Sequence, residues 1–122
     1  MTSPRPVTLV ALGLAIGAAF HAADVLRHGW WPYQFGPSGF RMFWNALLPL
    51  DLTVIALLAW KRRVGLVAAC ALMTADVAVN GYAWRVLGYD AFAAAVPIQV
   101  GFSLFVLIVT CRYLAGGPFT TG

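Results

Sequence analysis

The chain has few charged residues. Asp, Glu, Lys and Arg make up 10% of its 122 residues, against about 25% in ordinary soluble domains. The eight Lys and Arg residues are scattered at the ends of apolar runs, so they do not form the clustered basic surface that binds nucleic acid. We therefore expect no nucleic-acid partner and interpret the basic residues as signals of membrane topology.

Cysteine is scarce as well. Cys70 and Cys111 both lie within apolar runs, and the chain has no C-x-x-C motif. This argues against a thioredoxin-type redox pair and a structural zinc site, and it favours two buried free thiols that pack as small hydrophobic groups. His21 has no second intramembrane histidine with which to build a two-histidine haem site. We expect no metal and no cofactor.

Hydrophobic residues, in contrast, make up 61% of the chain, above the roughly 45–50% of soluble proteins. A chain of this length forms one domain at most, and a domain so small leaves much of its surface exposed. The excess apolar surface must then face lipid. We predict an all-α integral membrane protein, and the composition disfavours the alternative, a soluble helical bundle.

Four apolar stretches are long enough to cross a bilayer, which takes about 20 residues of helix. They cover residues 7–26, 43–60, 64–84 and 91–111, and each must be helical because backbone polar groups cannot stay unpaired in hydrocarbon. We predict one four-helix transmembrane bundle over residues 1–115 and a flexible tail over 116–122. The first stretch resembles a signal peptide, but its apolar run continues beyond the candidate cleavage site at residues 17–19, which favours retention.

The basic residues predict the orientation of the bundle. Five lie on the side of the two termini and three on the other; they are Arg5, Lys61, Arg62, Arg63 and Arg112 against Arg27, Arg41 and Arg85. Cytoplasmic connections carry the excess of Lys and Arg. We therefore expect a multi-pass protein of the cell membrane with both termini in the cytoplasm. Its expected partner is lipid, and a homo-oligomer and a larger membrane complex are both left open.

The two halves of the chain resemble each other. Residues 23–30 and 75–82 share an Asp and a Gly at the same spacing, and Pro49 and Pro97 each precede a polar residue by two positions. Asp, Gly and Pro are rare or costly within a span, so their agreement predicts two tandem two-helix hairpins related as a parallel repeat. Gly13-x-x-x-Gly17 and the equivalent Gly65 and Ala69 are expected to be close-packing positions.

Polar side chains within the spans are the candidate functional residues. An Asp at a helix centre costs about 2.5–3.5 kcal/mol in lipid, so such groups should face one another or water. Depth along the helices places two of them near the midplane and the rest further outward. The candidates for binding a ligand or proton are Asp51, Asp76, His21, Asn80, Gln99, Asn45 and Asp24.

The helical spacing of these residues predicts one shared cavity. His21 and Asp24 are three residues apart, and Asp76 and Asn80 are four apart, so each pair lies on one helix face. Pro49 and Pro97 are expected to bend the second and fourth helices. The result would be an acidic cavity that opens to the outside, with Asp51 and Gln99 at the midplane.

Each candidate also has a simpler interpretation. Asp24 could pair with Arg27 at the membrane surface, and Asn80 and Gln99 could hold helices together. Asp51 is hardest to explain in this way, because no Lys or Arg lies at its depth; it is either protonated or part of a proton or cation site. The aromatic-rich connection over residues 27–42, together with Trp44 and Trp60, is expected at headgroup level.

Three functions are compatible with these features. The first is a transporter-like or solute-binding protein whose acidic cavity takes protons, a cation or a cationic solute. The second is an accessory or scaffold subunit whose polar residues pair with partner helices. The third is an intramembrane enzyme that uses His21 and an Asp on a lipid, although the sequence has no nucleophile motif, and a non-enzymatic function is favoured.

Overall fold

The computed structural model describes residues 5–116 and is all-helical. Four long helices, α1 (Arg5–His28), α2 (Ser38–Trp60), α3 (Arg62–Arg85) and α4 (Ala95–Leu114), are joined by short connections, the last of which contains a 3-10 turn, η1 (Asp90–Phe92). All four are long and apolar enough to cross a membrane. The four predicted spans are thus present. The flexible tail predicted over 116–122 lies outside the described residues from 117 onward.

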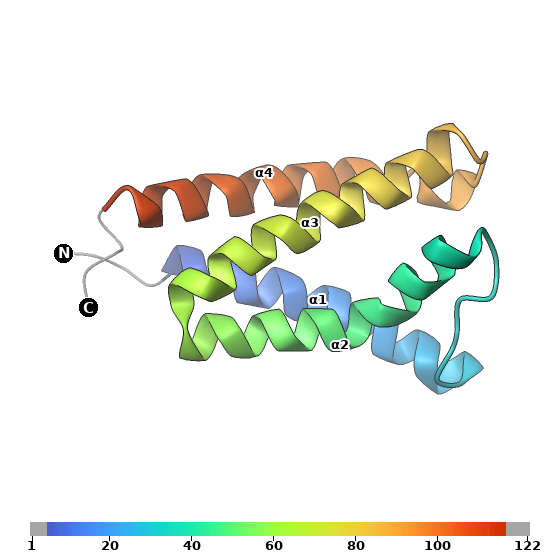
Figure 1. Ribbon diagram of the computed structural model, residues 1–122, viewed down its shortest axis with the longest axis horizontal. Helices are drawn as coiled ribbons and strands as arrows, with labels where there is room; N and C mark the ends of the chain where they lie inside the picture. The colour runs from blue at the N-terminus through green and yellow to red at the C-terminus, as the bar shows by residue number, and fades with distance from the viewer. Residues whose placement is uncertain (1–4, 117–122) are drawn as a thin grey trace.

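The helices form an antiparallel bundle with two different ends (Figure 1). At one end, called the turn end below, α1 begins, α4 ends, and α2 joins α3 at Lys61. At the other, the loop end, residues 29–37 join α1 to α2, and η1 lies between α3 and α4. Each helix packs mainly against its neighbour in sequence, with less contact between α1 and α4.

The two prolines lie in different places within their helices. Pro49 is inside α2, which bends toward α3 in its N-terminal part (Figure 1), as expected where a proline removes a helical hydrogen bond. Pro97 lies in the first turn of α4, because that helix begins at Ala95 and not at residue 91. Proline is tolerated there since no N–H donor is needed, so the bend predicted at Pro97 is wrong.

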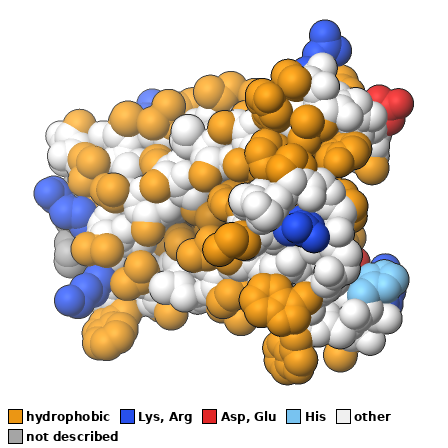
Figure 2. All heavy atoms as spheres, turned by 45° about the vertical axis from the view of Figure 1, so that its right-hand side comes forward, with side chains coloured by type: hydrophobic (Ala, Val, Ile, Leu, Met, Phe, Trp, Pro, Cys, Tyr) orange, Lys and Arg blue, Asp and Glu red, His pale blue; other side chains and the backbone are white. Residues whose placement is uncertain are grey.

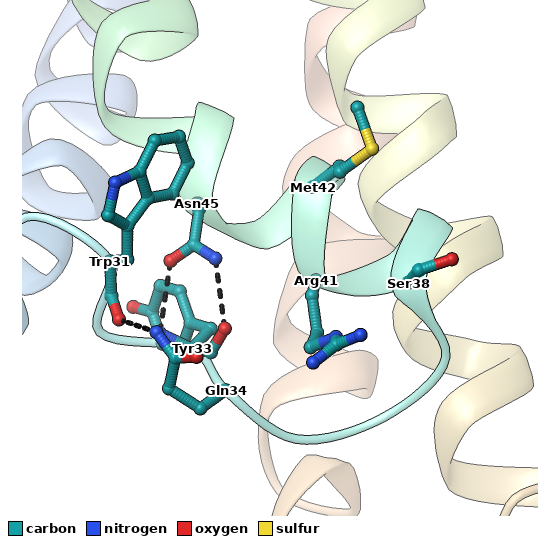
Figure 3. A pocket seen from close by; sticks show the side chains of 7 residues that line it. All are labelled: Trp31, Tyr33, Gln34, Ser38, Arg41, Met42 and Asn45. Carbon is teal, nitrogen blue, oxygen red and sulfur yellow. Dashed lines mark hydrogen bonds between the residues drawn. The ribbon is translucent and has the colours of Figure 1, made fainter.

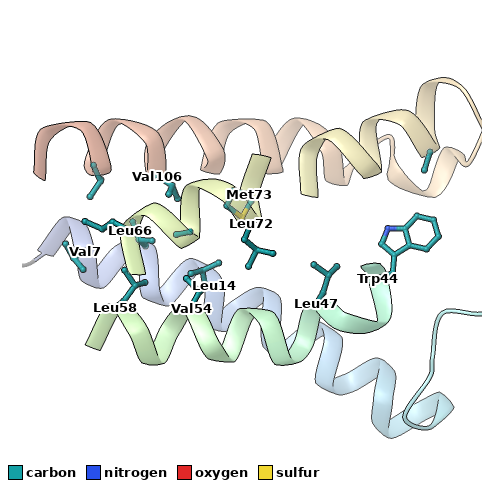
Figure 4. Packing of buried hydrophobic residues seen from close by; sticks show 14 residues of the cluster. Val7, Leu14, Trp44, Leu47, Val54, Leu58, Leu66, Leu72, Met73 and Val106 are labelled. Carbon is teal, nitrogen blue, oxygen red and sulfur yellow. The ribbon is translucent and has the colours of Figure 1, made fainter. Parts of the chain in front are cut away.

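The turn end has a close-packed apolar core. Val10, Leu66 and Val106 are completely buried there, and buried apolar side chains are denser at this end than toward Trp44 (Figure 4). Two glycines permit the close approach of helices. A Cβ on Gly13 would clash with the ring of Phe102 on α4, and one on Gly65 would clash with the backbone of α2. The predicted role of these glycines in packing is confirmed.

The outer faces of the helices are apolar. Large hydrophobic side chains such as Phe20, Trp60 and Ile98 are more than half exposed. Hydrophobic side chains cover much of the face shown in Figure 2, with Lys and Arg side chains near the two ends of the helices. Lipid is the environment that suits such a surface. Cys111 is exposed on it, so the prediction that both thiols are buried is wrong for this residue; Cys70 is partly buried, and its thiol lies 3.1 Å from the Thr110 hydroxyl.

Candidate functional site

A cavity of about 120 Å³ lies between the helices at the loop end. All four helices, the first connection and η1 contribute to its wall. Its lining combines acidic, amide and aromatic side chains; it comprises His21, Tyr33, Phe35, Trp44, Leu47, Asp76, Asn80, Phe92, Ala95 and Gln99. A concave site with a few convergent polar groups is the usual form of a small-molecule site.

Asn80 joins the polar groups of three helices. Its side-chain amide donates to Asp76 Oδ1 (3.2 Å) and to Gln99 Oε1 (3.1 Å). Its carbonyl oxygen accepts a hydrogen bond of 2.8 Å from the indole N–H of Trp44. Asn80 is thereby fixed between α2, α3 and α4, and it holds one oxygen of Asp76.

The other oxygen of Asp76 remains available. In the part of the chain that the structure describes, Asp76 Oδ2 makes no hydrogen bond, and no fully buried side-chain polar atom lacks a partner. Asp76 itself is only 8% exposed and lines the cavity. Oδ2 is therefore partly accessible, on a residue that lines the cavity.

A second chain of polar contacts runs along α1. Tyr33, from the first connection, donates its hydroxyl hydrogen to Asp24 Oδ2, and its hydroxyl oxygen lies 2.9 Å from His21 Nδ1. His21 Nε2 in turn lies 3.8 Å from Asp51 Oδ2 on α2. Gly17 of α1 lies beside Asp51: a Cβ at that position would be 3.4 Å from Asp51 Oδ2, an ordinary van der Waals contact.

The side chain of Asn45 holds the backbone of the first connection beside the cavity. Asn45 accepts a hydrogen bond from the backbone N–H of Tyr33 (3.0 Å) and donates one to its carbonyl (2.9 Å), as Figure 3 shows. Gly36 has a φ of +85°, and a Cβ there would be 3.0 Å from the ring of Trp44. Only glycine combines this backbone conformation with so close an approach.

The charges at the site are unbalanced. Asp51 and Asp76 are near enough for their charges to repel each other, and within residues 5–116 the one ion pair of either carboxylate is His21–Asp51. Outside the helices, burial raises the pKa of Tyr33, as does its hydrogen bond to Asp24. Tyr33 therefore stays a neutral hydroxyl donor at physiological pH. A proton or a cation is the counter-charge that the two carboxylates lack.

The structure places the seven predicted residues in two linked groups. Asp76, Asn80 and Gln99 meet around the cavity. His21, Asp24 and Asn45 meet at Tyr33. Asp51 lies beside His21, is 5% exposed, and does not itself line the cavity.

Two details of the sequence interpretation are corrected. The carboxylate of Asp24 accepts from Tyr33, and in the described part of the chain it makes no ion pair with Arg27. Gln99 lies in the second turn of α4, near the loop end, and not at the midplane. The reason is that residues 90–92 form η1, so α4 begins later than the apolar run does.

Tyr33 and Trp44 are site residues that the sequence interpretation assigned to the membrane surface. Trp44 is only 3% exposed, because its indole N–H has a partner in Asn80 and its ring stacks on Phe92. The spacing of α2 contained a signal for this. Its buried residues recur every three or four positions, at Trp44, Leu47, Asp51, Val54 and Leu58, so Trp44 shares a face with Asp51. Tyr33 has no comparable signal, because it lies in an irregular connection.

A larger hollow of about 220 Å³ lies on the other side of Tyr33 and is the one drawn in Figure 3. Its wall includes Trp31, Ser38 and Arg41 but none of the buried acids. We assign the candidate site to the smaller cavity, because the buried titratable groups converge there. In residues 5–116 no three His, Cys, Asp or Glu side chains are grouped to hold a metal ion.

Comparison of the chain with protein-family models, with curated proteins and with solved structures finds no match.

Proposed function

We propose that this protein is a transporter-like or solute-binding protein of the cell membrane that takes a small cation into the loop-end cavity. The observation that carries the proposal is the placement of Asp76, a buried carboxylate in the lining of a cavity that also has aromatic side chains. Such charged groups within a membrane span are costly and characteristically mark ion or substrate pathways. The second carboxylate, Asp51, adds negative charge nearby.

The size and lining of the cavity favour a small alkylammonium ion. A cavity of about 150 Å³ holds benzene, whereas drug-sized ligands occupy about 300–1,000 Å³, so a volume of about 120 Å³ suits a solute of a few heavy atoms. Phe35, Trp44 and Phe92 supply aromatic surface, which attracts weakly hydrated organic cations. Asp76 and Gln99 supply the oxygen acceptors for N–H groups.

Protons would compete with the cation for the same carboxylates. A cation bound beside Asp76 favours the ionised form of Asp76 and, less strongly, that of Asp51, which does not line the cavity; protonation of either carboxyl weakens the attraction. Binding of the cation therefore releases protons, and the apparent affinity falls as the pH falls. This competition is the mechanism by which uptake would be coupled to protons.

Orientation follows from the basic residues. We propose that the turn end, with Lys61, Arg62 and Arg63, is cytoplasmic, so that the cavity is on the outer side of the membrane. The tandem-hairpin hypothesis remains a proposal as well. Asp24 lies four residues before the end of α1, whereas its counterpart Asp76 lies nine residues before the end of α3, so the two halves would contribute unequally to the site.

The proposal is tested with ethylammonium as the probe in proteoliposomes that contain the full chain. Wild-type protein is expected to take up or bind ethylammonium and to release protons in doing so. Asp51→Asn and Asp76→Asn, which keep the side-chain shape and remove the charge, are expected to abolish both signals. Asp90→Asn, on exposed η1, is the matched control. Uptake and binding that are unchanged in both buried variants would refute the proposed function.

Stoichiometric co-purification of other membrane proteins in mild detergent, together with the absence of ethylammonium binding, would favour the accessory-subunit alternative.

A further inference from the structure

Four side chains form a continuous line of proton-exchanging groups between the surface end of α1 and the middle of α2. In order they are Asp24, Tyr33, His21 and Asp51. The first two contacts are hydrogen bonds. The third, 3.8 Å between His21 Nε2 and Asp51 Oδ2, is longer than a hydrogen bond, so proton transfer at this step requires the two side chains to approach each other.

The line runs from the loop-end surface to a buried carboxyl group. Asp24 is in the last turns of α1 at the loop end, whereas Asp51 is well inside α2 and 5% exposed. Asp51 does not line the cavity, so a cation or water in the cavity does not reach it directly. A buried carboxyl of this kind needs a route for its proton, and the line provides one that passes beside the cavity wall.

We propose that Asp24, Tyr33 and His21 form a proton relay between Asp51 and the loop-end surface. This deepens the proposed function, because it supplies the protons that compete with the cation. In the outward direction, the proton on Asp51 Oδ2 passes to His21 Nε2 and leaves an imidazolium. The Nδ1 proton of His21 then passes to the hydroxyl oxygen of Tyr33, while the hydroxyl proton of Tyr33 passes to Asp24 Oδ2.

The net transfer is one proton from Asp51 to Asp24, after which Asp24 loses it to water at the surface. Rotation of the Tyr33 hydroxyl and exchange of the His21 tautomer restore the starting arrangement. Tyr33 suits this role because it remains protonated: burial and the hydrogen bond to Asp24 raise its pKa.

The groups that face His21 define what the relay responds to. Asp24 is on its own helix, Asp51 is on α2, and Tyr33 is in the first connection. Asp76 of α3 and Gln99 of α4 line the same cavity as His21. Ionised Asp51 and Asp76 both stabilise the imidazolium, so the relay works in the direction that the charge in the cavity sets: a bound cation expels the proton outward.

The test measures proton exchange at Asp51 without any solute. The full chain in liposomes is subjected to a rapid pH jump, and the infrared carboxyl band that Asp51→Asn removes is followed with time. Tyr33→Phe keeps the ring and deletes the hydroxyl. It is expected to slow the exchange roughly 10²-fold, the lower end of what a positioned proton-transfer group contributes. Tyr82→Phe, at a half-exposed tyrosine outside the line, is expected to exchange at the wild-type rate.

A second variant protects the test against misfolding of Tyr33→Phe. Asp24→Asn still accepts the hydrogen bond from Tyr33 but does not accept a proton, and it is expected to slow the exchange to a similar degree. Wild-type exchange rates in both variants would overturn the relay, as would a carboxyl spectrum that Asp51→Asn does not change. Because no cation is added, a failed ethylammonium assay with slowed exchange here would reject the proposed function and leave the relay standing.

Discussion

The two ends of the bundle are built from different chemistry. At the turn end, aliphatic side chains and small residues pack around Val10, Leu66 and Val106, which are completely buried. At the loop end, aromatic rings and hydrogen-bonded polar groups surround a cavity, and Asp76 and Asn80 are buried with the apolar residues. The same four helices thus make a dense core at one end and a polar site at the other.

The difference in packing indicates that the two ends have different roles. Close packing of aliphatic side chains excludes water, so the turn end closes the bundle. The hydrogen bonds of Asn80 and Asn45 instead fix polar side chains in defined places around an open space. A site that takes a cation from one side of the membrane needs both parts, and the following predictions separate them.

The largest effect on stability is expected from the turn end. Leu66→Ala removes a completely buried side chain and leaves a cavity, and it should lower the free energy of unfolding by about 2–5 kcal/mol. Leu104→Ala, at a side chain that is 55% exposed, is the matched control and should change it little. Unfolding by denaturant in detergent measures both. Equal destabilisation by the two variants would contradict the assignment of the core to this end.

A smaller effect is expected where Asn45 holds the first connection. Asn45→Ala leaves the backbone N–H and carbonyl of Tyr33 without their partners and should cost about 1–3 kcal/mol. The backbone amide hydrogen of Tyr33 should also exchange faster with water in this variant, which hydrogen-exchange mass spectrometry detects. Gln34→Ala, in the same connection but exposed, should leave that exchange unchanged. Protection of Tyr33 that survives Asn45→Ala would show that other contacts hold the connection.

The smallest expected effect is the difference in stability between two glycine variants of the first connection. Gly36→Ala introduces a side chain at a positive φ and beside the Trp44 ring, and a strained residue of this kind costs about 1–3 kcal/mol. Gly29→Ala has a similar φ of +89° but nothing within 4 Å, so it incurs the backbone cost alone. Gly36→Ala should therefore be the more destabilising of the two by thermal unfolding. The reverse order would mean that the connection does not press on Trp44.

Much of the fold could be predicted from the sequence, because each span is one uninterrupted apolar run and lipid imposes helix on it. The inward faces could be predicted too, since Asp76 and Asn80 are one helical turn apart. The position of Gln99 along α4 could not be predicted, because the apolar run from residue 91 includes both η1 and the start of α4. The position of Tyr33 could not be predicted for another reason: the path of its connection depends on a hydrogen bond to Asn45, which is twelve residues away in sequence.

The proposed cation site at the loop end is tested most directly by calorimetric titration of ethylammonium into the purified protein. Wild-type protein should bind at neutral pH and more weakly at acidic pH, because protons compete for Asp51 and Asp76. Asp76→Asn should weaken binding by at least about 2 kcal/mol, roughly thirtyfold, whereas Leu104→Ala should bind as the wild type does. Binding that is equal in Asp76→Asn and wild type, or independent of pH, would contradict the account.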